Sequence, residues 1–76
     1  MNAGSIIGRF VILRGSLKSV SIFNEIAFEK KEIVEYFGER DLGLVIQKSD
    51  VWLQIITPSG QIGWSYLYNY EVINSL

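Results

Sequence analysis

The fold is decided by the stretch VWLQIITPSGQIGW, residues 51–64. Two runs rich in β-branched and aromatic residues, Trp52–Thr57 and Gln61–Trp64, flank the segment Pro58-Ser59-Gly60. Proline sets φ for the second position of a tight turn, and glycine takes positive φ at little steric cost. The stretch therefore predicts a β-hairpin.

Three further apolar runs surround this hairpin. Arg9–Arg14 lies between Gly8 and Gly15, and the other two runs are Leu42–Gln47 and Tyr70–Ile73. Polar and turn-forming residues separate the runs, as expected between short strands. Five strands within 76 residues predict a single all-β domain, residues 1–76, in the form of a five-stranded barrel, because closure removes most exposed strand edges.

Residues 16–41 form a long excursion between the first and second predicted barrel strands. Ile26, Ile33, Val34 and Phe37 fit one helical face, and Gly38 could end a helix. We therefore expect a helical turn or short helix near Lys30–Phe37. The alternative is that Val20–Phe23 and Ile26–Phe28 are paired strands, since their apolar residues alternate. A connection of this length is usually functional or well packed.

Charge is unevenly distributed along the chain. Seven Lys and Arg against eight Asp and Glu give a formal net charge of −1. Residues 1–24 carry +3, residues 25–41 carry −3, and the remainder carries −1. No charged residue lies between Val51 and Tyr70, yet this stretch holds Trp52, Trp64, Tyr66 and Tyr68. The uncharged aromatic region is a candidate contact surface.

The composition excludes several kinds of active site. Without His or Cys the chain has no histidine base, no thiolate nucleophile and no Cys/His zinc site. The acidic residues between Glu25 and Asp41 are interleaved with Lys30, Lys31 and Arg40, which is typical of a solvated face. We therefore expect a protein that is not an enzyme and has no cofactor or metal.

The amino terminus offers no targeting signal. Met1–Ile7 lacks a basic region, Asn2 stands where myristoylation needs glycine, and no window approaches the roughly 20 apolar residues that span a bilayer. We expect no membrane contact and a location in a virion or the cytoplasm.

Several motifs together resemble the Src-homology-3-like small barrels. They are Gly8-x-x-Val11-x-Leu13, Gly43-x-Val45, Trp52-Leu53-Gln54-Ile55, Gly60-Gln61-Ile62-Gly63-Trp64 and the closing Tyr70–Ile73. The ending is similar to the bacterial branch of that fold, and the chain also resembles small barrels among accessory proteins of tailed bacteriophages. The likeness covers about two thirds of the chain and is weakest between Ser16 and Asp41. It implies a fold more specifically than a function, because this fold serves many unrelated roles.

The resemblance implies a binding site. In peptide-binding members, a tryptophan opening the third strand and a tyrosine before the last strand form a groove for extended ligands. Strand alternation places Trp52 and Gln54 on one face, with Leu53 and Ile55 on the other. The predicted binding residues are Trp52, Gln54, Tyr66 and Tyr68. The alternative is that Trp52 and Tyr66 cap the core of an undersized barrel, and Trp64 is expected to be core. The Ala-Leu-Tyr-Asp-Tyr run of proline-rich-peptide binders is missing after Phe10.

Three functions remain open. The first is a non-catalytic interaction or assembly module, such as an accessory structural protein of a bacteriophage particle, that contacts a protein partner or assembles with itself. The second is a barrel that binds a peptide or cell-wall fragment through Trp52 and Tyr66. The third is a barrel that binds single-stranded nucleic acid through Arg9, Arg14 and Lys18. The third is disfavoured, because a net charge of −1 supports little phosphate binding.

Overall fold

The computed structural model describes residues 5–27 and 30–73, and these residues form one antiparallel sheet. Its strands are β1 Phe10–Leu13, β2 Ser19–Phe23, β3 Ile33–Gly38, β4 Gly43–Ser49, β5 Trp52–Ile56, β6 Ile62–Tyr66 and β7 Tyr70–Ile73. A short 3₁₀ turn, η1 Leu67–Asn69, joins β6 to β7, and the described part of the chain contains no α-helix. The all-β class predicted from the sequence is confirmed.

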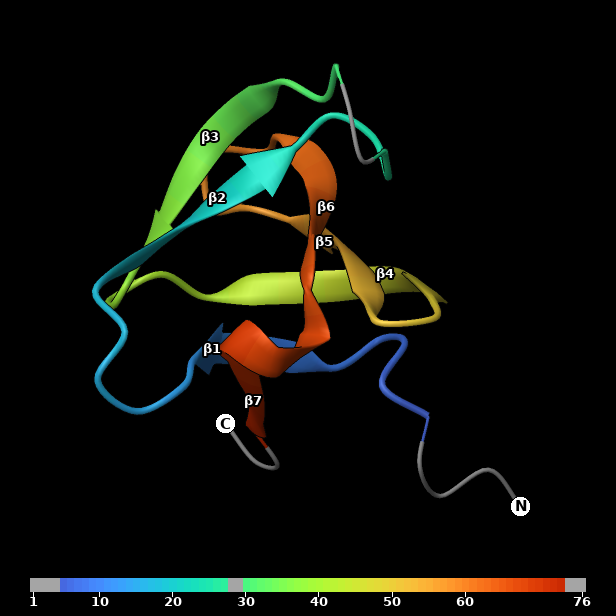
Figure 1. The fold of residues 1–76 in the computed structure, drawn as a ribbon. Helices are drawn as coiled ribbons and strands as arrows, with labels where there is room; N and C mark the ends of the chain where they lie inside the picture. Colours follow the sequence, from blue (N-terminus) through green and yellow to red (C-terminus); the bar gives the residue numbers. More distant parts are fainter. Residues whose placement is uncertain (1–4, 28–29, 74–76) are drawn as a thin grey trace.

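The sheet is open. Its strand order is β3-β2-β6-β5-β4-β1-β7, so β3 and β7 are the two edge strands and do not pair with each other. The β2–β3 hairpin lies at one end of the molecule and β1 with β7 at the other, with β4 between them (Figure 1). The prediction of a closed five-stranded barrel is therefore corrected to an open, seven-stranded sheet.

The five strands predicted from the sequence are all present, with ends shifted by at most two residues. The decisive hairpin is formed by β5 and β6, with Trp52 opposite Tyr66 and Ile56 opposite Ile62. The Gly60 N–H donates to the Thr57 carbonyl at 2.9 Å, and Gly60 has a φ of +91°. This conformation explains why glycine stands at that position of the turn.

The prediction of a helix near Lys30–Phe37 is wrong, because residues 33–38 are strand β3 and pair with β2 from Ser19↔Gly38 to Phe23↔Ile33. Lys30 has a φ of 61°, which no right-handed helix accepts. As a strand, the segment buries Phe37 completely and turns Tyr36 outward. Burying a phenylalanine contributes about 1.5–3 kcal/mol to stability.

The alternative expectation for this region is confirmed for Val20–Phe23, which lies in β2, but not for its partner. Ile26 and Ala27 are outside any strand, and Phe28 lies outside the described residues. The middle of β3 is anchored to the β5–β6 turn, because Thr57 Oγ1 and Ser59 Oγ donate to Glu35 Oε1 at 2.7 and 2.8 Å. The excursion is thus an integral hairpin of the sheet.

The core lies on the concave inner face of the sheet. It contains the buried side chains of Val11, Leu13, Ile22, Phe37, Val45, Leu53, Ile55 and Tyr70. The Tyr70 hydroxyl donates to Ser65 Oγ at 2.8 Å, and Ser65 Oγ donates to the Ser21 carbonyl at 3.2 Å. This chain of hydrogen bonds satisfies the polar atoms that the core encloses and joins β7, β6 and β2.

Candidate binding pocket

The β5–β6 register brings the two predicted aromatic residues into direct contact. Leu53 and Ile55 are fully buried, so alternation along β5 turns Trp52 to the outer face of the sheet. Tyr66 stands directly opposite Trp52 on β6, and the two rings stack with centroids 4.2 Å apart and an interplanar angle of 25°. This stacked pair, called the aromatic platform below, lies at one end of the hairpin.

A third ring supports this platform from a distant part of the chain. Phe23, the last residue of β2, contacts Trp52 edge-on, with ring centroids 6.3 Å apart and an interplanar angle of 80°. Phe23 reaches this position because it is the β2 residue that pairs with Trp64 on β6. Edge-to-face contacts of this kind hold an aromatic ring in one orientation.

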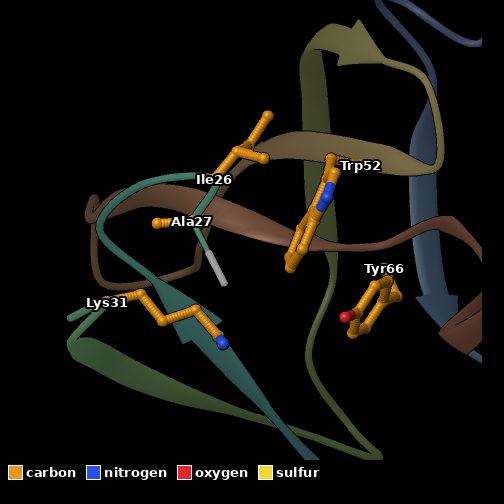
Figure 2. Close-up of a pocket in the computed structure, with 5 residues that line it drawn as sticks. All are labelled: Ile26, Ala27, Lys31, Trp52 and Tyr66. Carbon is orange, nitrogen blue, oxygen red and sulfur yellow. The ribbon is translucent and has the colours of Figure 1, made fainter. Parts of the chain in front are cut away.

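Trp52 and Tyr66 line an open pocket of about 90 Å³ together with Ile26, Ala27 and Lys31. The loop between β2 and β3 supplies the last three residues. Figure 2 shows Lys31 on one side of the pocket and Tyr66 on the other, with the Tyr66 hydroxyl on the side that faces Lys31. The Lys31 Nζ lies 5.0 Å from the centre of the Phe23 ring, within the range of a cation–π contact.

The pocket has the size and chemistry of a subsite for one side chain. Pockets that hold drug-sized ligands or cofactors measure roughly 300–1,000 Å³, whereas this pocket measures about 90 Å³. Within the described part of the chain, neither the Trp52 indole N–H nor the Tyr66 hydroxyl has a hydrogen-bond partner. An apolar side chain could therefore rest on the rings while these two groups bond to the ligand backbone.

The other two predicted binding residues lie outside the pocket. Gln54 is half-buried on β5, two residues after Trp52 and opposite Trp64 on β6. Tyr68 is 64% exposed on η1 and does not line the pocket. Trp64, expected in the core, is instead half-buried on the outer face, because its neighbours Gly63 and Ser65 face inward.

Sequence reasoning missed Phe23, Ile26, Ala27 and Lys31 as members of this site. The alternation of Val20–Phe23 is the one sequence signal for these residues, because it predicts a strand that ends at Phe23 and a loop that follows it. Nothing in the local pattern shows that β2 lies beside β6. The pairing that completes the pocket joins residues far apart in the sequence.

The basic residues of the amino-terminal third are engaged within the fold. Arg14 Nη2 and Nε donate to the Tyr70 carbonyl at 2.9 and 3.3 Å, which ties β7 to the loop after β1. The Lys18 Nζ lies 3.6 Å from Glu39 Oε2. Among residues 5–27 and 30–73, no cluster of three or more Asp, Glu, His or Cys side chains is arranged to hold a metal ion.

Comparison of the chain with protein-family models, with curated proteins and with solved structures gave no match. Within the residues that the structure describes, no helix is long and apolar enough to cross a membrane.

Proposed function

We propose that this protein is a non-catalytic interaction module that binds an extended segment of a partner protein at the Trp52–Tyr66 pocket. The observation that carries this proposal is the stacked pair of Trp52 and Tyr66, whose ring centroids are 4.2 Å apart. The pair forms one side of an open pocket, and the β2–β3 loop forms the other side. Aromatic platforms with a polar edge recur in sites that bind extended peptides. The uncharged stretch 51–70, a candidate contact surface in the sequence, and the excursion 16–41 both contribute residues to this pocket.

The position of Trp52 and Tyr66 on paired strands supports the same proposal. Trp52 and Tyr66 belong to paired strands, and their orientation follows from the burial of Leu53, Ile55 and Ser65 beside them. A ligand that docks on groups already held in place loses less conformational freedom than one that must order a loop.

The test is selection of short peptides from a surface-displayed random library on the wild-type protein, followed by affinity measurement on three variants. Tyr66→Ala and Trp52→Ala should each weaken binding at least roughly tenfold, as for hot-spot aromatics. Tyr36→Ala is the matched control, because Tyr36 is 63% exposed on β3 and does not line the pocket. Equal binding by folded Tyr66→Ala and wild type, or a selection with no enriched sequence, would refute the proposal.

A second candidate function, self-assembly, is favoured by an apolar row across the outer face of the sheet. Cross-strand pairing aligns Ile73, Phe10, Leu44, Ile56 and Ile62 from β7 to β6. Ile62, at the end of the row, is 51% exposed. A continuous uncharged row of this kind suits contact with a second copy.

Light scattering during gel filtration tests this second candidate. It predicts that the wild-type chain self-associates and that Ile62→Lys shifts it toward the monomer, while Tyr36→Lys does not. A strictly monomeric wild type at high protein concentration would end the self-assembly proposal and leave the pocket proposal intact.

The Src-homology-3-like relationship and a place in a bacteriophage particle are proposed from the sequence resemblance alone. Binding of single-stranded nucleic acid is a weaker proposal, because the Arg14 and Lys18 side chains have partners within the fold. It would require salt-sensitive binding to single strands at low ionic strength.

A further inference from the structure

The Lys31 side chain sets a charge beside an otherwise aromatic and apolar pocket. Lys31 is half-buried, lines the pocket, and holds its ammonium group 5.0 Å from the centre of the Phe23 ring. The remaining lining residues, Ile26, Ala27, Trp52 and Tyr66, carry no charge. Among the described residues that line the pocket, Lys31 is therefore the one that carries a charge.

The surroundings of Lys31 differ from those of two other basic residues. Lys18 lies beside Glu39, and the Lys48 Nζ donates to the Asp50 carbonyl at 2.8 Å. By contrast, no carboxylate among residues 5–27 and 30–73 lies within ion-pair distance of the Lys31 Nζ, which faces the Phe23 ring. An ammonium group that faces an aromatic ring gains further from an anionic partner.

We propose that the pocket selects segments that carry an aspartate or glutamate close to the apolar residue that rests on Trp52 and Tyr66. The proposal rests on the proposed function, and it adds the chemical class of the ligand. The carboxylate would pair with Lys31 while the apolar side chain covers the aromatic platform. Charge complementarity with Lys31 is what identifies an acidic segment of a partner protein as the occupant.

The geometry of an extended chain limits the spacing of the two ligand residues. Side chains that point to the same side are two residues apart in a β-strand and three apart in a polyproline II helix. Lys31 and the aromatic pair line the same pocket, so both ligand residues must point toward it. The recognised pattern is accordingly an apolar residue with an acidic residue two or three positions away.

Parallel peptide selections provide the test. The same random library is selected on the wild-type protein, on Lys31→Gln and on Lys30→Gln. Lys30 is the matched control, because it is exposed, adjacent in sequence and not part of the pocket, and its substitution removes the same charge. We expect acidic residues to be enriched at the stated spacing on the wild type and on Lys30→Gln, and not on Lys31→Gln.

Affinity measurements sharpen the result. Enriched sequences are made as peptides with acetylated and amidated ends, so that the side-chain carboxylate is their only added anion, and each is paired with its Glu→Gln or Asp→Asn counterpart. Lys31→Gln should weaken binding of the acidic peptide about tenfold and leave the neutral counterpart unchanged. Added salt should weaken only the acidic peptide on the wild type.

The two proposals fail in different ways. If Tyr66→Ala loses the selected peptides but Lys31→Gln binds acidic and neutral versions with the wild-type ratio, the acidic preference is wrong and the pocket proposal stands. If no peptide is enriched on the wild type, both are wrong. Enrichment of Lys or Arg at the stated spacing would also overturn the acidic preference.

Discussion

Tyr70 places a phenolic hydroxyl inside the core, and this shapes the response of the fold to alkaline pH. The side chain is 2% exposed, and its ring packs edge-on against Phe37 with centroids 5.4 Å apart. Burial raises the pKa of Tyr70 from 10.0 to about 12, and the hydrogen bond with Ser65 opposes that rise. The neutral phenol is therefore the form that the folded state requires.

The raised pKa predicts a loss of stability at high pH. Because the folded-state pKa exceeds the unfolded value, the contribution is complete below pH 10 and is lost as the pH rises toward 12. Two pKa units correspond to roughly 3 kcal/mol in the free energy of unfolding. Urea unfolding at a series of pH values between 10 and 12 measures this loss of stability. Tyr70→Phe is the control, and its unfolding free energy should fall less steeply; equal slopes would contradict the assignment.

At the residue scale, the hairpin register made two of the five pocket residues, Trp52 and Tyr66, predictable. The alternation of Leu53 and Ile55 with Trp52 shows which side of β5 faces out, and the Pro58-Ser59-Gly60 turn places Tyr66 opposite Trp52. Lys31 could not be placed in this way. Its position depends on the pairing of Phe23 with Trp64, which no local pattern in the sequence specifies.

At the scale of elements, the contact between β2 and β6 positions the β2–β3 loop over the aromatic pair. The close approach depends on Gly63, because a Cβ at this position would lie 2.7 Å from the Phe23 carbonyl oxygen. The backbone of β2 would have to move to accept any side chain. Gly63 thus permits the close packing of β2 on β6, and the position of the pocket-lining loop depends on that packing.

Gly63→Ala should therefore destabilise the fold and disturb the pocket. We expect the free energy of unfolding to fall by about 1–3 kcal/mol, as for other overpacked sites. Gly38→Ala is the matched control in β3, since its nearest neighbour to a new Cβ would be Asp41 Oδ2 at 3.6 Å. Chemical denaturation compares the two variants. Similar stability for both would show that β2 does not pack closely on β6.

The strands themselves were predictable to different extents. The five confirmed strands are short runs bounded by glycine or polar turns, so local pattern and turn chemistry agree. Strand β3 was missed because Ile33, Val34 and Phe37 also fit one face of a helix. The burial of Ile22 and Phe37, which favours the strand, is a tertiary effect.

At the scale of the whole molecule, the seven strands curve around one small core and leave much of the outer face apolar. A chain of this length typically buries only about 60% of its unfolded surface. The aromatic pocket and the row ending at Ile62 are two outer regions where a partner could add burial. The two regions differ in charge, because Lys31 lines the pocket whereas the row carries no charged residue.

Chemical-shift mapping by NMR directly tests whether the Trp52–Tyr66 pocket binds a peptide. The protein is labelled with ¹⁵N and titrated with the peptide most enriched in the selection. Binding at this pocket predicts that the largest shifts occur at the Trp52 indole N–H and at the backbone amides of Tyr66, Ala27 and Lys31. Shifts confined to β1, β4 and β7, with the Trp52 indole signal unchanged, would contradict it.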